Sequence, residues 1–194
     1  MPEHIEFNEL VSHIPPVADI DCQRMDTFGM LCAGRAKYIP ATAKAVIEIM
    51  KFYNIQTEGK NVTIVGRSIT VGLPLSMVLM SKSKYGNATV CVCHSRTKKL
   101  AEHTKYADII VVAVGKPGLL KENMVSEDTT VIDVGTTYKD GKLYGDVDFE
   151  NVAEKVSAIT PVPGGVGPVT TVCLFQNLIT AALERKKQKN IKAR

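Results

Sequence analysis

The stretch that decides the fold is Asn61-Val62-Thr63-Ile64-Val65-Gly66-Arg67-Ser68-Ile69-Thr70-Val71-Gly72-Leu73-Pro74. After Asn61, four consecutive β-branched residues predict a buried strand, and Gly66 opens a turn. Residues 73–81 predict a helix, because Pro74 stands in its first turn, where a missing N–H is tolerated. A strand, a glycine turn and a helix in this order predict the first unit of a Rossmann-type α/β fold.

The rest of the chain continues this alternation of strands and helices. Further strands are predicted at 88–93, 108–114, 130–134 and 157–160, and further helices at 42–53, 97–106 and 169–187. Apolar Val/Ile runs separated by helices predict a parallel sheet covered on both faces. Residues 1–39 lack a sustained period and predict a short helix, a linker and a loop.

Composition places the chain among soluble globular proteins, with 45% hydrophobic and 23% charged residues. No uninterrupted apolar run approaches the roughly 18 residues that span a bilayer, so no membrane partner is expected. The net charge is +4, and the basic residues at 185–194 are interpreted as a solvated helix end. Without an aromatic or groove-reading motif they predict no nucleic-acid partner. The five cysteines are irregularly spaced, which predicts reduced thiols in the cytoplasm.

A metal site is not predicted from the sequence. Cys91 and Cys93 alternate along a predicted strand and should face one buried side, with His94 beside them. No second cluster has zinc-ligand spacing. His103 falls on a polar helical segment and is expected to be an exposed residue.

The glycine turn predicts a dinucleotide site, because backbone N–H groups at a helix start can approach phosphate. Compared with the usual G-x-G-x-x-G pattern, Ser68 replaces the second glycine and Gly72 comes one residue late. The alternative interpretation is a plain strand-to-helix turn in which Ser68 caps the helix.

The second strand indicates which dinucleotide is preferred. It ends in His94-Ser95-Arg96-Thr97-Lys98-Lys99, without the acid that accepts bonds from ribose hydroxyls in NAD enzymes. A cationic, hydroxyl-rich strand end suits a 2′-phosphate, and Arg67 is expected to face the same region. The sequence therefore favours NADP, while Lys98 and Lys99 are interpreted as solvated. The loops at 114–118, with Lys116, and at 133–136 are expected at the same ligand-binding edge.

The most specific segment is Pro161-Val162-Pro163-Gly164-Gly165-Val166-Gly167-Pro168-Val169-Thr170-Thr171. With Gly66-Arg67-Ser68 and His94-Ser95, it closely resembles the bifunctional methylenetetrahydrofolate dehydrogenase/methenyltetrahydrofolate cyclohydrolase family. Asp133-Val134-Gly135 and Gly145-Asp146-Val147 match the family as well. The resemblance implies that residues 1–41 are a remnant of a folate-binding catalytic domain. Residues 42–168 would then form the NAD(P)-binding domain, and 169–194 a final helix and basic tail.

The resemblance also implies an activity and a set of site residues. The activity is hydride transfer from 5,10-methylenetetrahydrofolate to NADP, followed by hydrolysis of the methenyl product to 10-formyltetrahydrofolate in the same cleft. Asp21 matches the aspartate that holds the pteridine ring, and it is the one catalytic residue the resemblance assigns here. Gly164 and Gly165 would line the substrate cleft, and related enzymes imply a homodimer. The residues that would contact NADP are Gly66, Arg67, Ser68, Ser95 and Thr136.

The family's catalytic lysine belongs to a Tyr-x-x-x-Lys motif in an N-terminal domain, and the chain starts after it. Tyr138 and Lys142 have this spacing, but Asp140-Gly141 between them signals a hairpin turn. We therefore expect the isolated chain to bind NADP, to transfer hydride poorly and to be nearly inactive in hydrolysis. A non-catalytic NADP-binding partner or regulator is the alternative. A dehydrogenase of another substrate class is disfavoured by Asp21 and the proline-glycine loop.

Overall fold

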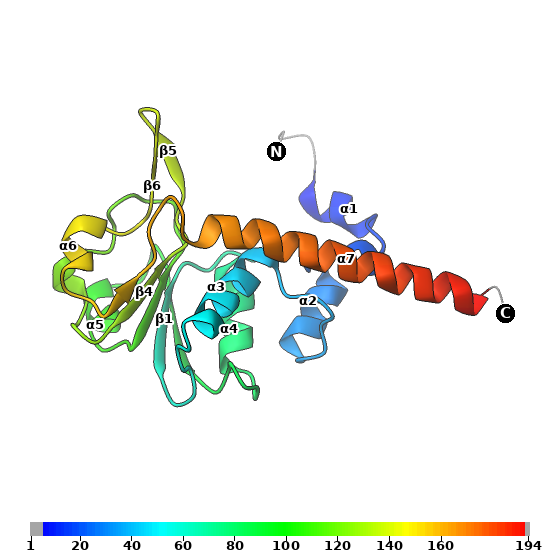
Figure 1. Cartoon of the computed structure of the whole chain (residues 1–194), viewed down its shortest axis with the longest axis horizontal. Helices are drawn as coiled ribbons and strands as arrows, with labels where there is room; N and C mark the ends of the chain where they lie inside the picture. The colour runs from blue at the N-terminus through cyan, green and yellow to red at the C-terminus, as the bar shows by residue number, and fades with distance from the viewer. Residues whose placement is uncertain (1–5, 193–194) are drawn as a thin grey trace.

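The structure is a computed structural model that describes residues 6–192, with side chains at 6–7 and 9–187 (Figure 1). The helices are α1 (Phe7–Ser12), α2 (Met25–Cys32), α3 (Ala41–Phe52), α4 (Gly72–Met80), α5 (Leu100–Thr104), α6 (Phe149–Ala153) and α7 (Val166–Lys192). The strands are β1 (Asn61–Val65), β2 (Thr89–Cys93), β3 (Ile109–Val112), β4 (Thr130–Asp133), β5 (Thr137–Lys139), β6 (Lys142–Tyr144) and β7 (Ala158–Ile159). Short 3-10 turns lie at Pro16–Ala18 and Glu122–Met124.

Five of the strands form one parallel sheet in the order β2-β1-β3-β4-β7. Val65 at the end of β1 pairs with Cys93 of β2 on one side and with Val112 of β3 on the other. The chain thus runs outward from β1 to β2 and then returns to the far side of β1. The predicted parallel α/β sheet is confirmed, and its topological switch point lies between β1 and β3.

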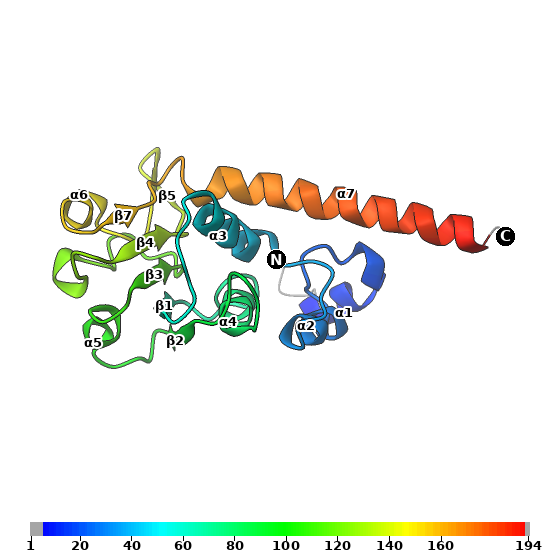
Figure 2. The same cartoon turned by 60° about the horizontal axis from the view of Figure 1, so that its bottom comes forward.

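Helices cover both faces of this sheet, as predicted. Figure 2 shows α3 and α4 on one side of the strands and α5 and α6 on the other. The four residues of β3 show why, because Ile109 and Val111 join one buried cluster while Ile110 and Val112 join the other. All four are at most 2% exposed. Each such side chain contributes roughly 1.5–3 kcal/mol through burial.

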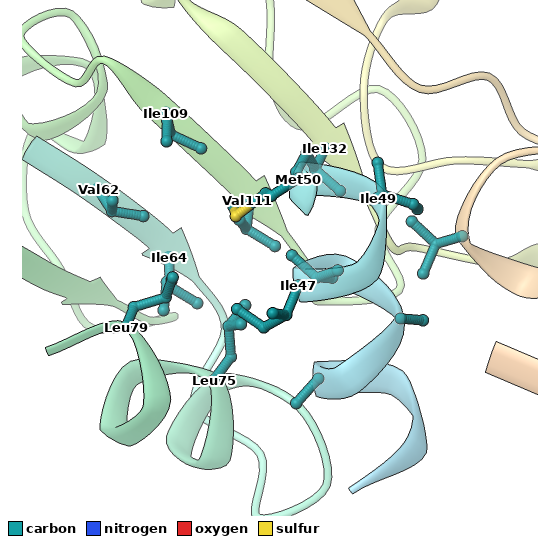
Figure 3. Packing of buried hydrophobic residues seen from close by; sticks show 14 of the residues in the cluster. Ile47, Ile49, Met50, Val62, Ile64, Leu75, Leu79, Ile109, Val111 and Ile132 are labelled. Atoms are coloured by element: carbon teal, nitrogen blue, oxygen red, sulfur yellow. The ribbon is translucent and has the colours of Figure 1, made fainter. Parts of the chain in front are cut away.

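The first cluster lies between α3, α4 and the sheet (Figure 3). Met50 of α3 points onto the strands near Val111 and Ile132, and Leu75 and Leu79 of α4 approach Ile64. These side chains recur at helical spacing on α3 and α4, so each helix presents one apolar face to the sheet. The predicted amphipathic helix at 42–53 is confirmed as α3.

Several element boundaries differ from the sequence prediction. The helix predicted at 97–106 shortens to α5, because Lys99 adopts a left-handed conformation (φ 53°) that a helix cannot include. The hairpin turn at Asp140-Gly141 is confirmed, with positive φ at both residues, but its flanking strands β5 and β6 were not predicted. Helices α2 and α6 were also missed, since each has only five to eight residues and little apolar period.

Helix α7 begins at Val166, three residues earlier than predicted, because Gly167 and Pro168 fit within its first turn. It packs along α3, as Figures 1 and 2 show. The larger apolar side chains of α7 are not the ones that this contact buries. Among the side chains of α7 that the structure describes, those of Val166, Cys173, Asn177 and Ala181 are buried. The apolar residues that stay exposed in this chain include Val172, Leu174, Phe175, Leu178, Ile179 and Ala182.

Residues 166–187 of α7 are long and apolar enough on average to cross a membrane by length and composition, although Gln176 and Asn177 interrupt the apolar run. Helices packed inside soluble proteins can have the same length and composition, and 22% of the apolar 18-residue window is buried in this chain. The buried amide of Asn177 donates to the carbonyl oxygens of Ile20 and Ile39, both at 2.9 Å, and accepts from Lys44 Nζ at 3.0 Å. These bonds attach the segment before α3 to the middle of α7.

Candidate coenzyme site

The carboxyl ends of the parallel strands meet along one edge of the sheet. Backbone bonds continue the ladder one residue past the strands, from Gly66 N to Cys93 O and from Ala113 N to Val65 O, both at 2.8 Å. The loops that follow β1, β2, β3 and β4 are therefore neighbours. In open α/β sheets this edge, at the switch point, is where ligands bind.

Two glycines make the turn after β1 possible. Gly66 has φ +133°, and a Cβ at this position would overlap the carbonyl oxygen of Ala113 at the end of β3. A Cβ at Gly72 would overlap the carbonyl oxygen of Gly66, because the start of α4 folds back onto the end of β1. Both positions require glycine for close backbone approach. The glycine that comes one residue late in the fingerprint thus serves helix–strand packing.

Ser68 organises the inside of this turn. Its hydroxyl accepts from the backbone N–H of Val71 at 3.1 Å and from Thr70 Oγ1 at 3.2 Å. Its carbonyl oxygen accepts from Leu73 N at 3.0 Å. The capping residue of α4 is Val71, so Ser68 stabilises the turn without being the helix cap that the alternative interpretation expected.

Arg67 and Ser95 occupy equivalent places on neighbouring strands. Each lies two residues beyond the paired residues Val65 and Cys93, and both are exposed. The loop around Ser95 is held from within, because His94 N donates to Thr97 Oγ1 at 2.9 Å and Arg96 N donates to His94 Nδ1 at 3.1 Å. Ser95 is therefore exposed at the surface, beside the turn that carries the exposed side chain of Arg67.

The loop after β3 is fixed by a carboxylate from a distant part of the chain. Asp146 is fully buried, and it accepts from the backbone N–H groups of Val114 (2.6 Å), Gly115 (2.9 Å) and Lys116 (2.6 Å). The side chain of Lys116 is exposed, so this residue contributes its backbone to the loop. Three charge-assisted bonds to one carboxylate hold this loop in a single backbone path.

A second buried carboxylate, Asp133 at the end of β4, continues this network. It accepts from Gly135 N (3.0 Å), Asp146 N (3.0 Å) and Val147 N (2.9 Å). Burial raises the pKa of Asp133 to about 6, although the three N–H donors act in the opposite direction. A Cβ at Gly135 would overlap the Asp146 carboxylate, and one at Gly145 would overlap that of Asp133.

Thr136 and the proline-glycine loop extend this edge towards β7. Thr136 is exposed directly after Gly135. Thr160, at the end of β7, accepts from Asp133 N through its hydroxyl at 2.8 Å, which joins the two strand ends. Gly164 has φ +100°, and a Cβ at Gly165 would overlap the carbonyl oxygen of Pro161. The loop therefore needs glycine at both positions.

Gly164 and Gly165 also line an open, mainly apolar groove of about 1050 Å³ between α3, β4 and β7. Asp21 and the coenzyme-side residues do not line it. Asp21 is half-buried at the start of α3, where its Oδ1 accepts from Ala41 N at 2.6 Å. Burial raises the pKa of Asp21, and the neighbouring Asp19 adds to this while the Ala41 bond opposes it. The structure thus gives Asp21 a helix contact that the sequence did not indicate.

The roles of Asp133 and Asp146 were also missed from the sequence. Both were noted only as matching residues, with no function in the fold. A weak signal exists, because each aspartate stands within two residues of a glycine near a strand end. Their six backbone bonds join positions 13 to 32 residues apart or close a local turn, and the pattern of a single sequence does not reveal such pairs.

Comparison with known proteins agrees with this site. The family model for the tetrahydrofolate dehydrogenase/cyclohydrolase NAD(P)-binding domain matches residues 40–186. The chain belongs to this family. The matched region starts at the residue before α3 and includes every strand of the sheet, so the coenzyme edge described above lies within the NAD(P)-binding domain of the family.

Individual members of the family cover nearly the whole chain. The bifunctional protein FolD of Dictyoglomus turgidum is 48% identical over 181 residues, which are 93% of this chain and 63% of that protein. The crystal structure of the bifunctional dehydrogenase/cyclohydrolase from Thermoplasma acidophilum superposes with a TM-score of 0.89 at 43% identity, over 96% of this chain and 66% of that one.

A third relative was solved with a coenzyme. The Trypanosoma brucei dehydrogenase-cyclohydrolase, complexed with NADP and an inhibitor, has a TM-score of 0.85 at 37% identity, over 93% of this chain and 63% of that one. The chain thus spans about 63% of the length of the curated relatives it matches. The division at residues 41 and 168 stays a prediction.

Proposed function

We propose that this chain forms the NADP-binding part of a methylenetetrahydrofolate dehydrogenase/methenyltetrahydrofolate cyclohydrolase. The observation that carries the proposal is the pair of exposed residues Arg67 and Ser95 at adjacent strand ends, with no acid at the end of β2. A guanidinium and a hydroxyl are donors for the 2′-phosphate that distinguishes NADP from NAD. The alternative of a non-catalytic NADP-binding partner or regulator is not favoured, because the relatives cited above are named as enzymes.

The residues of the turn after β1 would receive the rest of the coenzyme. Gly66 permits close backbone approach, Ser68 keeps the turn in shape, and the phosphates would lie beside this turn and the N-terminus of α4. Thr136 would contact the coenzyme from the next loop along the edge. The coenzyme supplies the hydride acceptor, and the protein supplies its orientation.

The folate side would be formed by Asp21, Gly164 and Gly165. A carboxylate suits a pterin, whose edge presents N–H donors, and the raised pKa of Asp21 reflects its partial burial. Oδ1 of Asp21 already accepts from Ala41 N, so the second oxygen is the one available to a pterin. Tyr138 and Lys142 lie exposed on the β5–β6 hairpin, where Lys142 pairs with Lys139 and Tyr138 with Leu143. They are therefore not proposed as the catalytic pair.

Calorimetric titration with NADP⁺ and NAD⁺ tests the coenzyme assignment. We expect NADP⁺ to bind more tightly, and Arg67→Gln to weaken NADP⁺ about 10–100-fold through loss of charge-assisted bonds while leaving NAD⁺ unchanged. Lys98→Gln is the matched control, because Lys98 is an exposed cation three residues beyond Ser95 and should not alter either affinity. Absence of NADP⁺ binding, or equal affinity for both dinucleotides, would overturn the assignment.

Catalysis is tested by following NADPH formation with methylenetetrahydrofolate. We expect the 194-residue chain to show slow hydride transfer, which depends mainly on orientation, and almost no hydrolysis of methenyltetrahydrofolate. Full cyclohydrolase turnover by these residues alone would contradict this expectation.

We also propose a cytoplasmic location, supported by five free cysteines, and a homodimer, supported by the exposed apolar residues of α7. Light scattering at several protein concentrations tests the dimer.

A further inference from the structure

Two thiols and an imidazole converge behind the end of β2, outside the coenzyme edge. Cys91 Sγ lies 3.9 Å from Cys93 Sγ and 3.7 Å from His103 Nδ1. The three atoms all lie within 4.8 Å of one another. Cys93 is buried, Cys91 is partly buried and His103 is exposed, so the cluster is reached from solvent on the histidine side.

The fold brings these residues together from two elements. Cys91 and Cys93 are two residues apart on β2 and therefore face the same side of the sheet. His103 comes from α5, which packs on that side. Thr63 of β1 donates through its hydroxyl to the backbone oxygen of His103 at 2.8 Å, which fixes this turn of α5 against the sheet. The imidazole is therefore supported by the backbone beneath it.

The spacing of these atoms suits a tetrahedral thiophilic cation. With Zn–S of about 2.3 Å and Zn–N of about 2.0–2.1 Å, tetrahedral ligands stand about 3.8 Å apart for two sulfurs and about 3.6 Å for sulfur and nitrogen. The 3.9 Å and 3.7 Å separations in the structure are close to these two values, and the third pair of atoms, in Cys93 and His103, lies within 4.8 Å. Two thiolates would balance a divalent charge in a partly buried place.

A disulfide fits this pair of cysteines less well. Residues that alternate on a strand have Cα atoms about 6.6 Å apart, near the upper limit of the range of about 4.4–6.8 Å found for disulfides. Without a cation, a hydrogen bond between the Cys91 thiol and the His103 imidazole would explain the 3.7 Å separation of Cys91 Sγ and His103 Nδ1.

We propose that Cys91, Cys93 and His103 form a binding site for zinc(II), with water as the fourth ligand on the exposed side. The site is distinct from the proposed coenzyme contacts, although Cys93 is only two residues before Ser95. A bound ion would join the edge strand β2 to α5. The proposal does not depend on the folate activity, and it holds or fails whatever the outcome of the NADP⁺ titration.

Zinc binding to the reduced full chain tests the site directly. After removal of metal by chelation, we expect one Zn²⁺ per chain in competition with a colorimetric chelator. We also expect Co²⁺ to give thiolate charge-transfer bands and the visible bands of a tetrahedral ion. Cys91→Ser and His103→Gln should each weaken Zn²⁺ more than about 100-fold, beyond the 10–100-fold typical of outer-shell partners. Cys32→Ser is the matched control, because Cys32 is an exposed free cysteine on α2.

The folding of each variant is monitored separately. Cys93→Ser is not used as a test variant, because Cys93 is buried and its substitution could unfold the chain. Cys91→Ser and His103→Gln change less buried positions, and their circular dichroism and melting in chelator should match those of the parent chain. Zn²⁺ should raise the melting temperature of the parent and of Cys32→Ser but not of the two site variants. A parent chain that binds no Zn²⁺, or site variants that bind it with parental affinity, would overturn the proposal and leave a thiol–imidazole hydrogen bond only.

Discussion

The two halves of the carboxyl edge of the sheet are built in opposite ways. At the ends of β1 and β2, side chains point outward, and Arg67 and Ser95 are exposed on loops closed by local bonds. At the ends of β3 and β4, the side chains that matter point inward, and the buried carboxylates of Asp133 and Asp146 bind the backbone of the surrounding loops.

This difference separates recognition from support. Exposed donors can select a phosphate at little structural cost, because water solvates them when no ligand is present. The inward carboxylates instead fix a backbone surface against which a flat ligand can lie, and six N–H groups depend on them. Substitutions in the first half should therefore change affinity, and those in the second should change stability.

The largest effect is expected from Asp146→Asn. An amide replaces one acceptor oxygen with donors that face the N–H groups of Val114, Gly115 and Lys116. We expect the free energy of unfolding to fall by about 3–5 kcal/mol, since buried donors are left without acceptors. Urea unfolding measures this loss. Asp140→Asn, at the exposed hairpin tip with φ 51°, is the control and should change stability by less than about 0.5 kcal/mol. An equal effect of both substitutions would contradict the separation.

A smaller effect is expected from the titration of Asp133. Its pKa of about 6 exceeds the ordinary 3.8, so the folded state holds the proton more tightly. The associated stability is fully present below pH 3.8 and is lost as pH rises through about 6, a change of up to about 3 kcal/mol. Urea midpoints measured from pH 4 to 7 should fall across this window. The slope should disappear in Asp133→Asn, and a slope that persists there would assign the titration to another group.

The smallest effect is expected from Ser95→Ala. Loss of one neutral hydroxyl donor should weaken NADP⁺ by about 3–10-fold, because a single such bond contributes about 1 kcal/mol. NAD⁺ affinity and unfolding should stay unchanged, since Ser95 is exposed and its loop is held by His94 and Thr97. Calorimetry beside a thermal melt checks both parts. If Ser95→Ala lowered the melting temperature as well as the affinity for NADP⁺, Ser95 would support the structure of its loop and would not act only in recognition.

Much of this edge could be predicted from the sequence, because its signals are local. The strand before Gly66, the glycine turn and the acid-free end of β2 are each contained in about ten residues, and all three lie where they were expected. Hydrophobic period also identified α3, because one of its faces is buried almost completely.

The rest depends on contacts between distant residues. Asp146 binds a loop about 30 residues earlier, and His103 meets Cys91 only because α5 packs on β2. The contact face of α7 could not be predicted from the sequence, because apolar residues occur around much of the helix and Asn177 at its centre is polar. Its burial follows from two carbonyl groups that no pattern within α7 reveals.

The amide of Asn177 also fixes the positions of two chain segments relative to α7. It donates hydrogen bonds to the carbonyl oxygens of Ile20, immediately before Asp21, and Ile39, immediately before Pro40. A shift of α7 along its axis by one turn would therefore break both hydrogen bonds. Asp21 therefore has a position set by the register of a helix more than 140 residues later in the chain. Any partner that shifts α7 along its axis would break these bonds and so release the backbone that positions the carboxylate proposed to hold the pterin, whether or not it touches that carboxylate.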